Sequence, residues 1–103
     1  MDKVIRDGKV AVLYSPGFGA GWYTWNTGHP QCLYDPEVVA WLEEDLPEEE
    51  FPNLEAKYGE YFYDGGWRDL VIAWLPVGTR FWITEYDGSE NLVLESEHEW
   101  QVA

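Results

Sequence analysis

The strongest constraint on the fold is a strand, turn and strand pattern near the C-terminus. Residues 80–86 read RFWITEY, and their alternation would place Phe81, Ile83 and Glu85 on one face of a strand and Trp82, Thr84 and Tyr86 on the other. The turn-forming run Asp87-Gly88-Ser89-Glu90 follows, and the apolar residues 92–94 lead back. An Asp-Gly pair between two such runs is typical of a β-hairpin. The pattern therefore predicts two antiparallel strands.

Further apolar runs are expected to join this hairpin in one sheet. Residues 9–14 (KVAVLY) follow Asp7-Gly8 and stop at Ser15-Pro16, as a first strand would. Residues 70–75 (LVIAWL) are apolar on both faces, which is typical of a central strand. The short runs at 61–63 and 100–102 could add brief strands. We expect an α+β fold with a mostly antiparallel sheet of about four to six strands.

One or two short helices are expected after the first strand. Asp35 can cap free N–H groups, and Pro36 suits the first position of a helix, where its missing N–H costs nothing. The residues that follow place Val38, Val39, Trp41 and Leu42 at helical spacing. A second short helix is expected within residues 52–58, and Gly59 would stop it.

Length and composition limit the organisation of the chain. Its 103 residues (1–103) are expected to form a single domain, because a chain of this size can bury one modest core. Cys32 is the sole cysteine, so an internal disulfide is excluded. No run approaches the ~18 to 20 apolar residues that span a bilayer, and the N-terminus is charged where a signal peptide would be apolar. We expect a cytosolic setting.

Charge is the most extreme property of the composition. The chain has 20 Asp and Glu against 6 Lys and Arg, for a formal net charge of -14. Binding to nucleic acid requires basic residues that neutralise phosphate, so direct binding is disfavoured. The acids either keep the surface solvated or fit the basic groove of a partner. The densest negative run comprises Glu43, Glu44, Asp45, Glu48, Glu49 and Glu50.

Residues 15–26 read SPGFGAGWYTWN and combine alternating glycines with large aromatic residues. The loop follows a strand, but its G-x-G-x-G spacing and the absence of a helix signal before Asp35 argue against dinucleotide-binding and P-loop folds. Two interpretations remain open. The loop could bind a ligand, with main-chain N–H groups approaching it and a base stacked on Trp22 or Trp25. It could also be a crossing loop whose Trp rings pack into the core.

No catalytic or metal-binding constellation stands out, so we expect a protein that is not an enzyme and needs no cofactor. A thiol nucleophile would pair Cys32 with His29 or His98, but no orienting group or oxyanion site is recognisable nearby. Acids and a histidine also lie close together near the C-terminus, but such runs are usually solvated strand ends; they are Glu95, Glu97, His98 and Glu99.

Three stretches carry a resemblance to a known group of proteins. They read SPGFGAGWYTWN, LYDPEVVAWLEE and DLVIAWLPVGTRFWITEYDGSE. Their order resembles that of small accessory proteins, of unassigned function, carried by tailed bacteriophages and prophages, and the likeness runs from Lys9 to Ala103. The resemblance brings no site residues with it. It implies the cytosol of an infected bacterium, where such proteins often bind host factors or blunt host defences.

Sequestration of a small nucleotide-like signalling ligand is the first function that fits this anti-defence setting. A small homo-oligomer would stack the base on an aromatic ring and neutralise phosphate with Lys9, Arg68 or Arg80. The predicted ligand-binding residues are Gly17, Phe18, Gly19, Gly21, Trp22, Trp25, Asn26, Arg68 and Arg80. The net negative charge opposes this function, because it repels an anionic ligand.

Nucleic-acid mimicry is the alternative. The acids at positions 43–50, together with Glu55, Glu60 and Asp64, would occupy the groove of a basic host defence protein. The charge favours mimicry, and the Gly-aromatic loop favours sequestration. A plain protein-interaction module is a further alternative.

Overall fold

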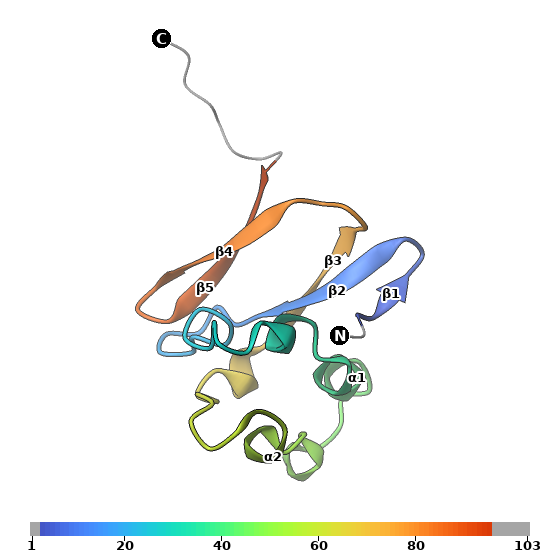
Figure 1. The fold of residues 1–103 in the computed structure, drawn as a ribbon. Coiled ribbons are helices and arrows are strands. Elements are labelled where there is room, and N and C mark those ends of the chain that lie inside the picture. The colour runs from blue at the N-terminus through green and yellow to red at the C-terminus, as the bar shows by residue number, and fades with distance from the viewer. Residues whose placement is uncertain (1–2, 96–103) are drawn as a thin grey trace.

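The computed structural model describes residues 3–95 and folds them into two antiparallel sheets with short helices (Figure 1). The first sheet has the strand order β1 (Ile5–Arg6), β2 (Lys9–Tyr14) and β3 (Val71–Pro76). The second sheet is the hairpin of β4 (Phe81–Tyr86) and β5 (Ser89–Leu94). The α+β class and the antiparallel pairing expected from the sequence are confirmed.

The β4–β5 hairpin has the turn that its sequence predicts. Tyr86 pairs with Ser89, which leaves Asp87 and Gly88 as the two turn residues. Both have positive φ angles, 51° and 83°. This backbone matches the right-handed twist of the flanking strands, and Asp-Gly adopts it readily. Local turn chemistry therefore fixes the register from Tyr86↔Ser89 to Phe81↔Leu94.

Three expectations about the arrangement of strands and helices are wrong. The strands form two sheets and not one, and the helices α1 and α2 lie between β2 and β3, not after the first strand. The second error arises because the Asp7-Gly8 turn lets Ile5–Arg6 fold back on β2 as an additional strand. The strand β3 is also not central, since β2 lies between its two neighbours.

Helix α1 begins, and helix α2 ends, at the residue that the sequence indicates, whereas α2 starts two residues later than expected. Helix α1 (Pro36–Glu43) starts after Asp35, whose side chain accepts the N–H groups of its first turn, and α2 (Leu54–Tyr58) starts after Asn53 and ends at Gly59. Three single-turn 3-10 helices accompany them: Pro30–Tyr34, Glu48–Glu50 and Trp67–Asp69. Residues 61–63 do not form the expected strand, and residues 100–102 lie outside the described part.

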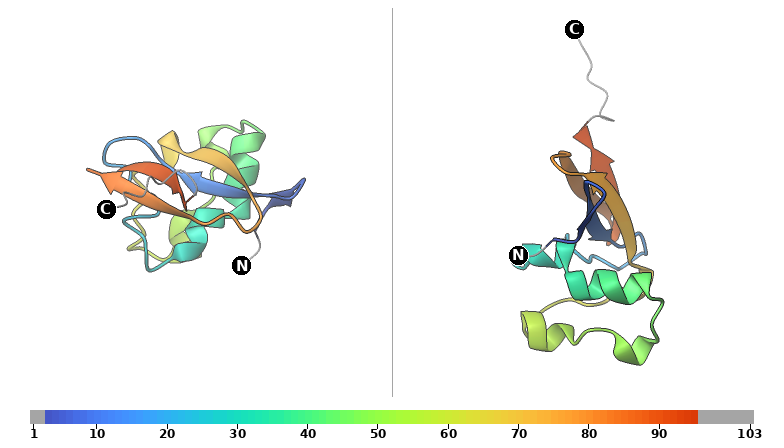
Figure 2. Two further views of the ribbon diagram at one scale, coloured as in Figure 1. Left: turned by 90° about the horizontal axis from the view of Figure 1, so that it is seen from above. Right: turned by 90° about the vertical axis from the view of Figure 1, so that its right-hand side faces the viewer.

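The first sheet is covered on both faces, which explains why the apolar β3 need not be central. Ala11 and Leu13 of β2 face the helices, and they pack in one core with Trp22, Val38 and Val39. The alternate residues of β2 face the β4–β5 hairpin in a second, smaller core; its members include Val10, Val12, Leu75, Phe81, Ile83, Leu92 and Leu94. Figure 2 shows the helices gathered below the strands.

Candidate functional site

The Gly-aromatic loop surrounds a buried carboxylate of the protein itself. Glu90 is fully buried, and its Oε1 accepts the N–H of Ser15 at 2.9 Å. Its Oε2 accepts the N–H groups of Tyr23 and Thr24 at 2.8 and 2.7 Å, and the Thr24 hydroxyl at 3.0 Å. Converging main-chain N–H groups of this kind form an anion-binding concavity. The loop therefore does bind an anionic group, which strand β5 supplies.

Sequence reasoning missed Glu90, although a signal for it was present. In a strand, residues two apart lie on the same face, so Glu90 shares the inward face of Leu92 and Leu94. An acid in line with core residues requires hydrogen-bond donors, because burying an unsatisfied charge is costly. The long-range partner of that acid was not readable from its own neighbourhood.

The glycines of the loop are tied to the hairpin turn. The N–H of Gly19 donates to the Asp87 carbonyl at 2.7 Å, and the N–H of Gly21 donates to the Gly88 carbonyl at 2.8 Å. A Cβ on Gly88 would lie 2.8 Å from the backbone of Gly19. At Gly17 an added Cβ would meet the Asp69 carboxylate. The loop and the turn are thus packed backbone to backbone.

Trp22 and Asn26, two of the predicted ligand-binding residues, lie in the interior. Trp22 is fully buried, donates its indole N–H to the Cys32 carbonyl at 3.0 Å, and packs edge-to-face on Phe62. The Asn26 amide donates to the carbonyls of Trp22 and Tyr63 and accepts the N–H of Tyr63. For these two residues the core-packing interpretation holds, and Trp22 has no exposed face on which a base could stack.

Trp25 and Phe18 remain accessible. Trp25 is 44% exposed and packs on the ring of Tyr63, with ring centroids 4.9 Å apart. Its ring also covers Gly21, where an added Cβ would lie 2.2 Å from it. Phe18 is 79% exposed. Of the aromatic residues predicted to stack on a ligand, these two offer an exposed face.

The two predicted phosphate-binding arginines each have an acidic partner. Arg68 lies 3.3 Å from a Glu48 oxygen and over the ring of Trp67. Arg80 lies 3.0 Å from a Glu95 oxygen. Arg68 belongs to the 3-10 helix Trp67–Asp69 and Arg80 immediately precedes β4, and neither lines the hollows described below. Neither of these two hollows brings the predicted set together.

A second buried carboxylate links the two helices. Asp35 is 1% exposed, and its Oδ1 accepts the N–H groups of Glu37 and Val38. The Lys57 ammonium lies 3.0 Å from its oxygens, and the Tyr58 hydroxyl donates to Oδ2. Burial and this contact raise the pKa of Tyr58 above its usual value. Burial lowers the pKa of Lys57, but the hydrogen bonds to Glu37 and Asp35 outweigh it, and the net shift is upward.

Cys32 is fully buried. Burial, followed by the negative charges of Glu90 and Asp35, raises the pKa of its thiol to about 12. A thiol is nucleophilic only as the thiolate, so this group is inert at neutral pH. The nearby His29 packs against the rings of Tyr58 and Phe62.

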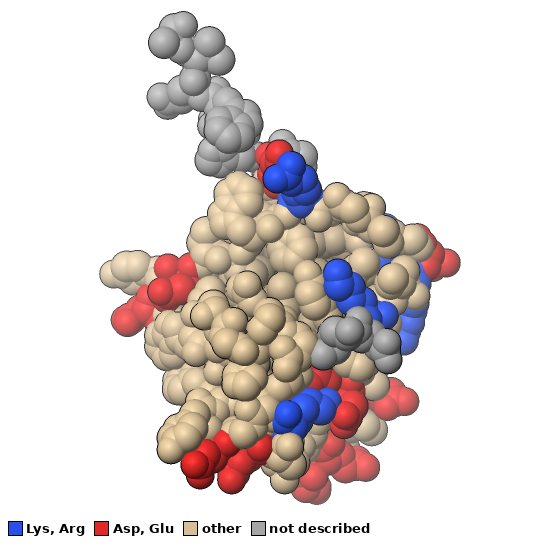
Figure 3. All heavy atoms as spheres, in the orientation of Figure 1, with Lys and Arg blue, Asp and Glu red and all other residues tan. Residues whose placement is uncertain are grey.

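The acidic segment, residues 43–50, is exposed and held in one shape by aromatic rings. The rings of Trp41, Phe51 and Trp67 pack on one another with centroids 4.7 to 5.9 Å apart, and the Trp41 indole donates to the Pro47 carbonyl. Glu43 pairs with Arg6 and Glu48 with Arg68. Within residues 3–95 the other four acids of the segment make no ion pair; they are Glu44, Asp45, Glu49 and Glu50. Figure 3 shows acids gathered over the helical end.

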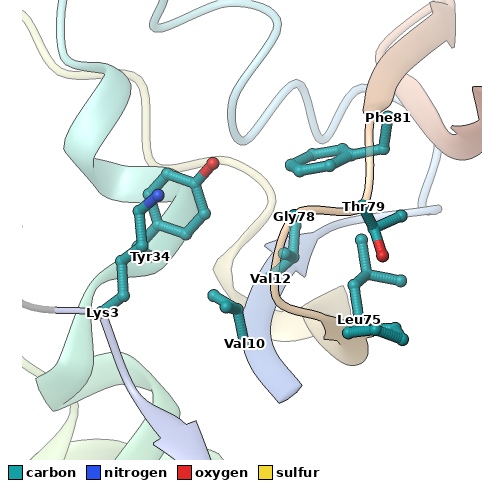
Figure 4. Close-up of a pocket in the computed structure, with 9 residues that line it drawn as sticks. Lys3, Val10, Val12, Tyr34, Leu75, Gly78, Thr79 and Phe81 are labelled. Carbon is teal, nitrogen blue, oxygen red and sulfur yellow. The ribbon is translucent and has the colours of Figure 1, made fainter. Parts of the chain in front are cut away.

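Two adjoining hollows lie beside the start of β4. The larger, about 360 Å³, is lined by Tyr23, Leu33, Tyr34, Phe81, Trp82 and Ile83. The smaller, about 190 Å³, shares Tyr34 and Phe81, and Figure 4 shows these two rings on opposite sides of it with Val10 and Val12 between them. The Lys3 ammonium lies 4.4 Å from the centroid of the Tyr34 ring. Burial and the neighbouring Tyr23 raise the pKa of Tyr34.

Within residues 3–95, no group of three or more His, Cys, Asp and Glu side chains could hold a metal ion, and no helix is long and apolar enough to cross a membrane. Three members of the acidic and histidine run near the C-terminus, Glu97, His98 and Glu99, lie outside the described residues. No protein-family model matches the chain, and no curated protein or solved structure shows significant similarity to it.

Proposed function

We propose that this chain is a non-catalytic binding protein that captures a basic protein partner on the acidic segment. The observation that carries the proposal is the packing of the Trp41, Phe51 and Trp67 rings on one another beside these exposed acids. Acids fixed in position bind a basic surface with less loss of conformational entropy than acids on a mobile loop. The segment therefore offers a preorganised negative surface.

The unpaired charges of the segment support this proposal. Ion pairs within the protein would neutralise the surface, but within residues 3–95 only Glu43 and Glu48 of the segment have them. The remaining acids keep their charge available to a partner, and the net charge of -14 steers a basic protein toward the chain. In the phage setting that the sequence resemblance implies, the expected partner is a basic nucleic-acid-binding protein of host defence.

Sequestration of a nucleotide-like ligand has less support and stays a prediction. The N–H groups of Gly19 and Gly21 already donate to the hairpin turn, and Trp22 is buried. The two arginines expected to neutralise phosphate lie beside Glu48 and Glu95. A nucleotide would have to bind Phe18 or Trp25 without these partners.

The proposal is tested by capturing partners from bacterial lysate, identifying them, and measuring the affinity of the purified pair. The double variant Glu49→Gln, Glu50→Gln removes two charges from the segment. Each exposed interfacial charge contributes roughly 0.5 kcal/mol, so we expect an affinity loss of about fivefold. Duplex DNA should compete for the partner, and the complex should dissociate as salt rises.

A matched control removes two charges elsewhere. Asp7 lies in an Asp-Gly turn with a positive φ angle, which asparagine also adopts well, and Asp69 is exposed and belongs to neither proposed binding surface, so Asp7→Asn, Asp69→Asn should leave the fold intact. If both double variants lose the same affinity, the loss reflects the net charge of the protein alone. That result would contradict a binding site at the acidic segment. Capture that resists salt would contradict the proposal as a whole.

A further inference from the structure

The free edge of β4 presents a regular row of backbone groups. The N–H of Glu95 donates to the Arg80 carbonyl at 2.9 Å, which places Arg80, Trp82, Thr84 and Tyr86 at the positions whose main chain bonds to β5. The alternate residues Phe81, Ile83 and Glu85 direct their N–H and C=O groups away from β5. Within residues 3–95, β4 pairs with no second strand.

The larger hollow borders β4. Phe81, Trp82 and Ile83 of β4 line it, whereas no residue of β5 does. The opposite wall consists of Tyr23, Leu33 and Tyr34. An apolar and aromatic hollow therefore lies next to the strand whose second edge, within residues 3–95, has no partner strand.

Opposite charges mark the two ends of the edge. At the Phe81 end, Lys3 lines the smaller hollow, and within the described residues it makes no ion pair. At the Tyr86 end, Glu85 and Asp87 are both exposed. A bound strand that is acidic near Lys3 and basic near Glu85 would match both ends.

We propose that this edge, the β4 groove, binds an extended segment of a partner protein as an added strand antiparallel to β4. The main chain of the segment bonds to Phe81, Ile83 and Glu85, as in β-augmentation. A large apolar side chain enters the hollow between Tyr34 and Phe81, with basic residues toward the N-terminal end of the segment and a carboxylate toward its C-terminal end. A second copy is a poor occupant, because each chain carries a net charge of -14.

The test uses the full chain and a synthetic heptapeptide of alternating valine and threonine. The probe has two lysines at its N-terminal end, one central phenylalanine and a free C-terminal carboxylate. Amide hydrogen exchange followed by NMR should slow at Phe81, Ile83 and Glu85 when the peptide binds, while the Trp82 and Thr84 amides change little. A peptide N-methylated at alternate residues cannot donate to β4, and we expect its affinity to fall by about tenfold or more.

Charge order is tested on both partners. Reversing the peptide sequence should weaken binding, and Lys3→Glu should weaken the original peptide about threefold. The control Lys9→Glu makes the same charge change at an exposed residue of β2 that lines neither hollow. Both variants should retain the exchange pattern of the free protein, which shows that they fold.

Several outcomes would overturn the proposal. Equal binding of the N-methylated peptide, or slowed exchange confined to other residues, would exclude strand addition at β4. Slow exchange at Phe81, Ile83 and Glu85 in the full chain without peptide would mean that the edge is already occupied. If that slow exchange depends on protein concentration, the occupant of the edge is a second copy. If it does not, the occupant is the chain's own C-terminal segment. The acidic-segment variants do not alter this edge, so the two proposals fail separately.

Discussion

Within residues 3–95 two carboxylates are buried, and they are stabilised by different means. Asp35 has a cation, Lys57, together with the Tyr58 hydroxyl and two N–H groups at the start of α1. Glu90 has three main-chain N–H groups and one hydroxyl, with no cation among its hydrogen-bond partners within residues 3–95. Asp35 joins two helices that are close in sequence, whereas Glu90 joins the loop to the last described strand.

The difference lies in how far each set of donors can adjust. The Lys57 ammonium is partly exposed and also pairs with Glu37, and the Tyr58 hydroxyl can rotate, so the partners of Asp35 have alternatives. The N–H groups around Glu90 have directions set by the backbone, and the Glu90 side chain itself is fully buried. A buried acid bound by fixed donors should therefore tolerate substitution less well than one bound by mobile side chains.

The largest effect is expected from Glu90→Gln. The amide of glutamine is isosteric, but one of its ends is an N–H donor that faces another donor, and the charge that strengthens the remaining hydrogen bonds is lost. We expect the free energy of unfolding, measured by urea denaturation, to fall by about 3 kcal/mol.

Glu85→Gln is the matched control, because Glu85 pairs directly with Glu90 across the hairpin and is exposed. Its free energy of unfolding should change by no more than about 0.5 kcal/mol. Similar losses of unfolding free energy in both variants would mean that the buried hydrogen bonds of Glu90 do not contribute more than an exposed glutamate does.

Gly21→Ala tests the loop that aims the N–H groups at Glu90. The added Cβ would meet the Trp25 ring at 2.2 Å, and the φ angle of 51° disfavours alanine. We expect a loss of about 2 kcal/mol in the free energy of unfolding. At Gly28 nothing lies within 4 Å of an added Cβ, so Gly28→Ala should be close to neutral. A neutral Gly21→Ala would show that the loop relaxes without disturbing the carboxylate site.

Asp35→Asn should have a smaller effect than Glu90→Gln. Asparagine keeps the helix cap, the Tyr58 hydroxyl can turn to accept from the new amide, and Lys57 retains Glu37. We expect a loss of about 1 kcal/mol in the same denaturation experiment. A loss equal to that of Glu90→Gln would refute the argument that adjustable partners soften the substitution.

The pKa of the Cys32 thiol depends on both carboxylates, and its change in each variant compares their electrostatic influence. Its thiol pKa, about 12, is raised first by burial and then by Glu90 and Asp35, in that order. Glu90→Gln should therefore lower the thiol pKa more than Asp35→Asn, by less than about one unit in each case. The ultraviolet absorbance of the thiolate, followed through an alkaline titration, measures both shifts. The reverse order would contradict the assignment of Glu90 as the nearer influence.

The same thiol makes stability depend on alkaline pH. A pKa raised on folding means that the folded state holds its proton more tightly, so the stabilising effect is complete below the ordinary value of 9.0 and is lost as pH rises toward about 12. The raised pKa of Tyr58 extends the loss above pH 10. Replacing Cys32 by alanine should reduce the decline in the free energy of unfolding that begins near pH 9.

Local signals predicted much of the fold. Asp87-Gly88 fixed a two-residue turn through its own backbone preference, and Asp35-Pro36 fixed the start of α1 in the same way. Such signals act over a few residues and are visible in a single sequence. The split into two sheets depends instead on which strands meet over long distances, and no local pattern encodes that.

The Gly-aromatic loop shows where sequence reasoning stops. Its composition suggested glycine N–H groups open to a ligand, but Gly19 and Gly21 donate to the hairpin turn. The N–H groups of Ser15, Tyr23 and Thr24 bind Glu90, which lies 66 to 75 residues away. The exposed acids at 43–50 were readable, because runs of charge stay in water. The β4 groove could not be predicted from the sequence, because it forms only where Leu33 and Tyr34 lie next to Phe81, which is distant in sequence.

The bond between the loop and Glu90 also sets an order of events in folding. Residues 15–24 are made early, but the N–H groups of Ser15, Tyr23 and Thr24 lack their acceptor until Glu90 is present, and β2 must likewise wait for β3. Contacts of this sequence separation carry a loop-closure penalty and slow folding. We therefore expect the N-terminal half to remain incompletely folded during synthesis and to become native in one late, cooperative step.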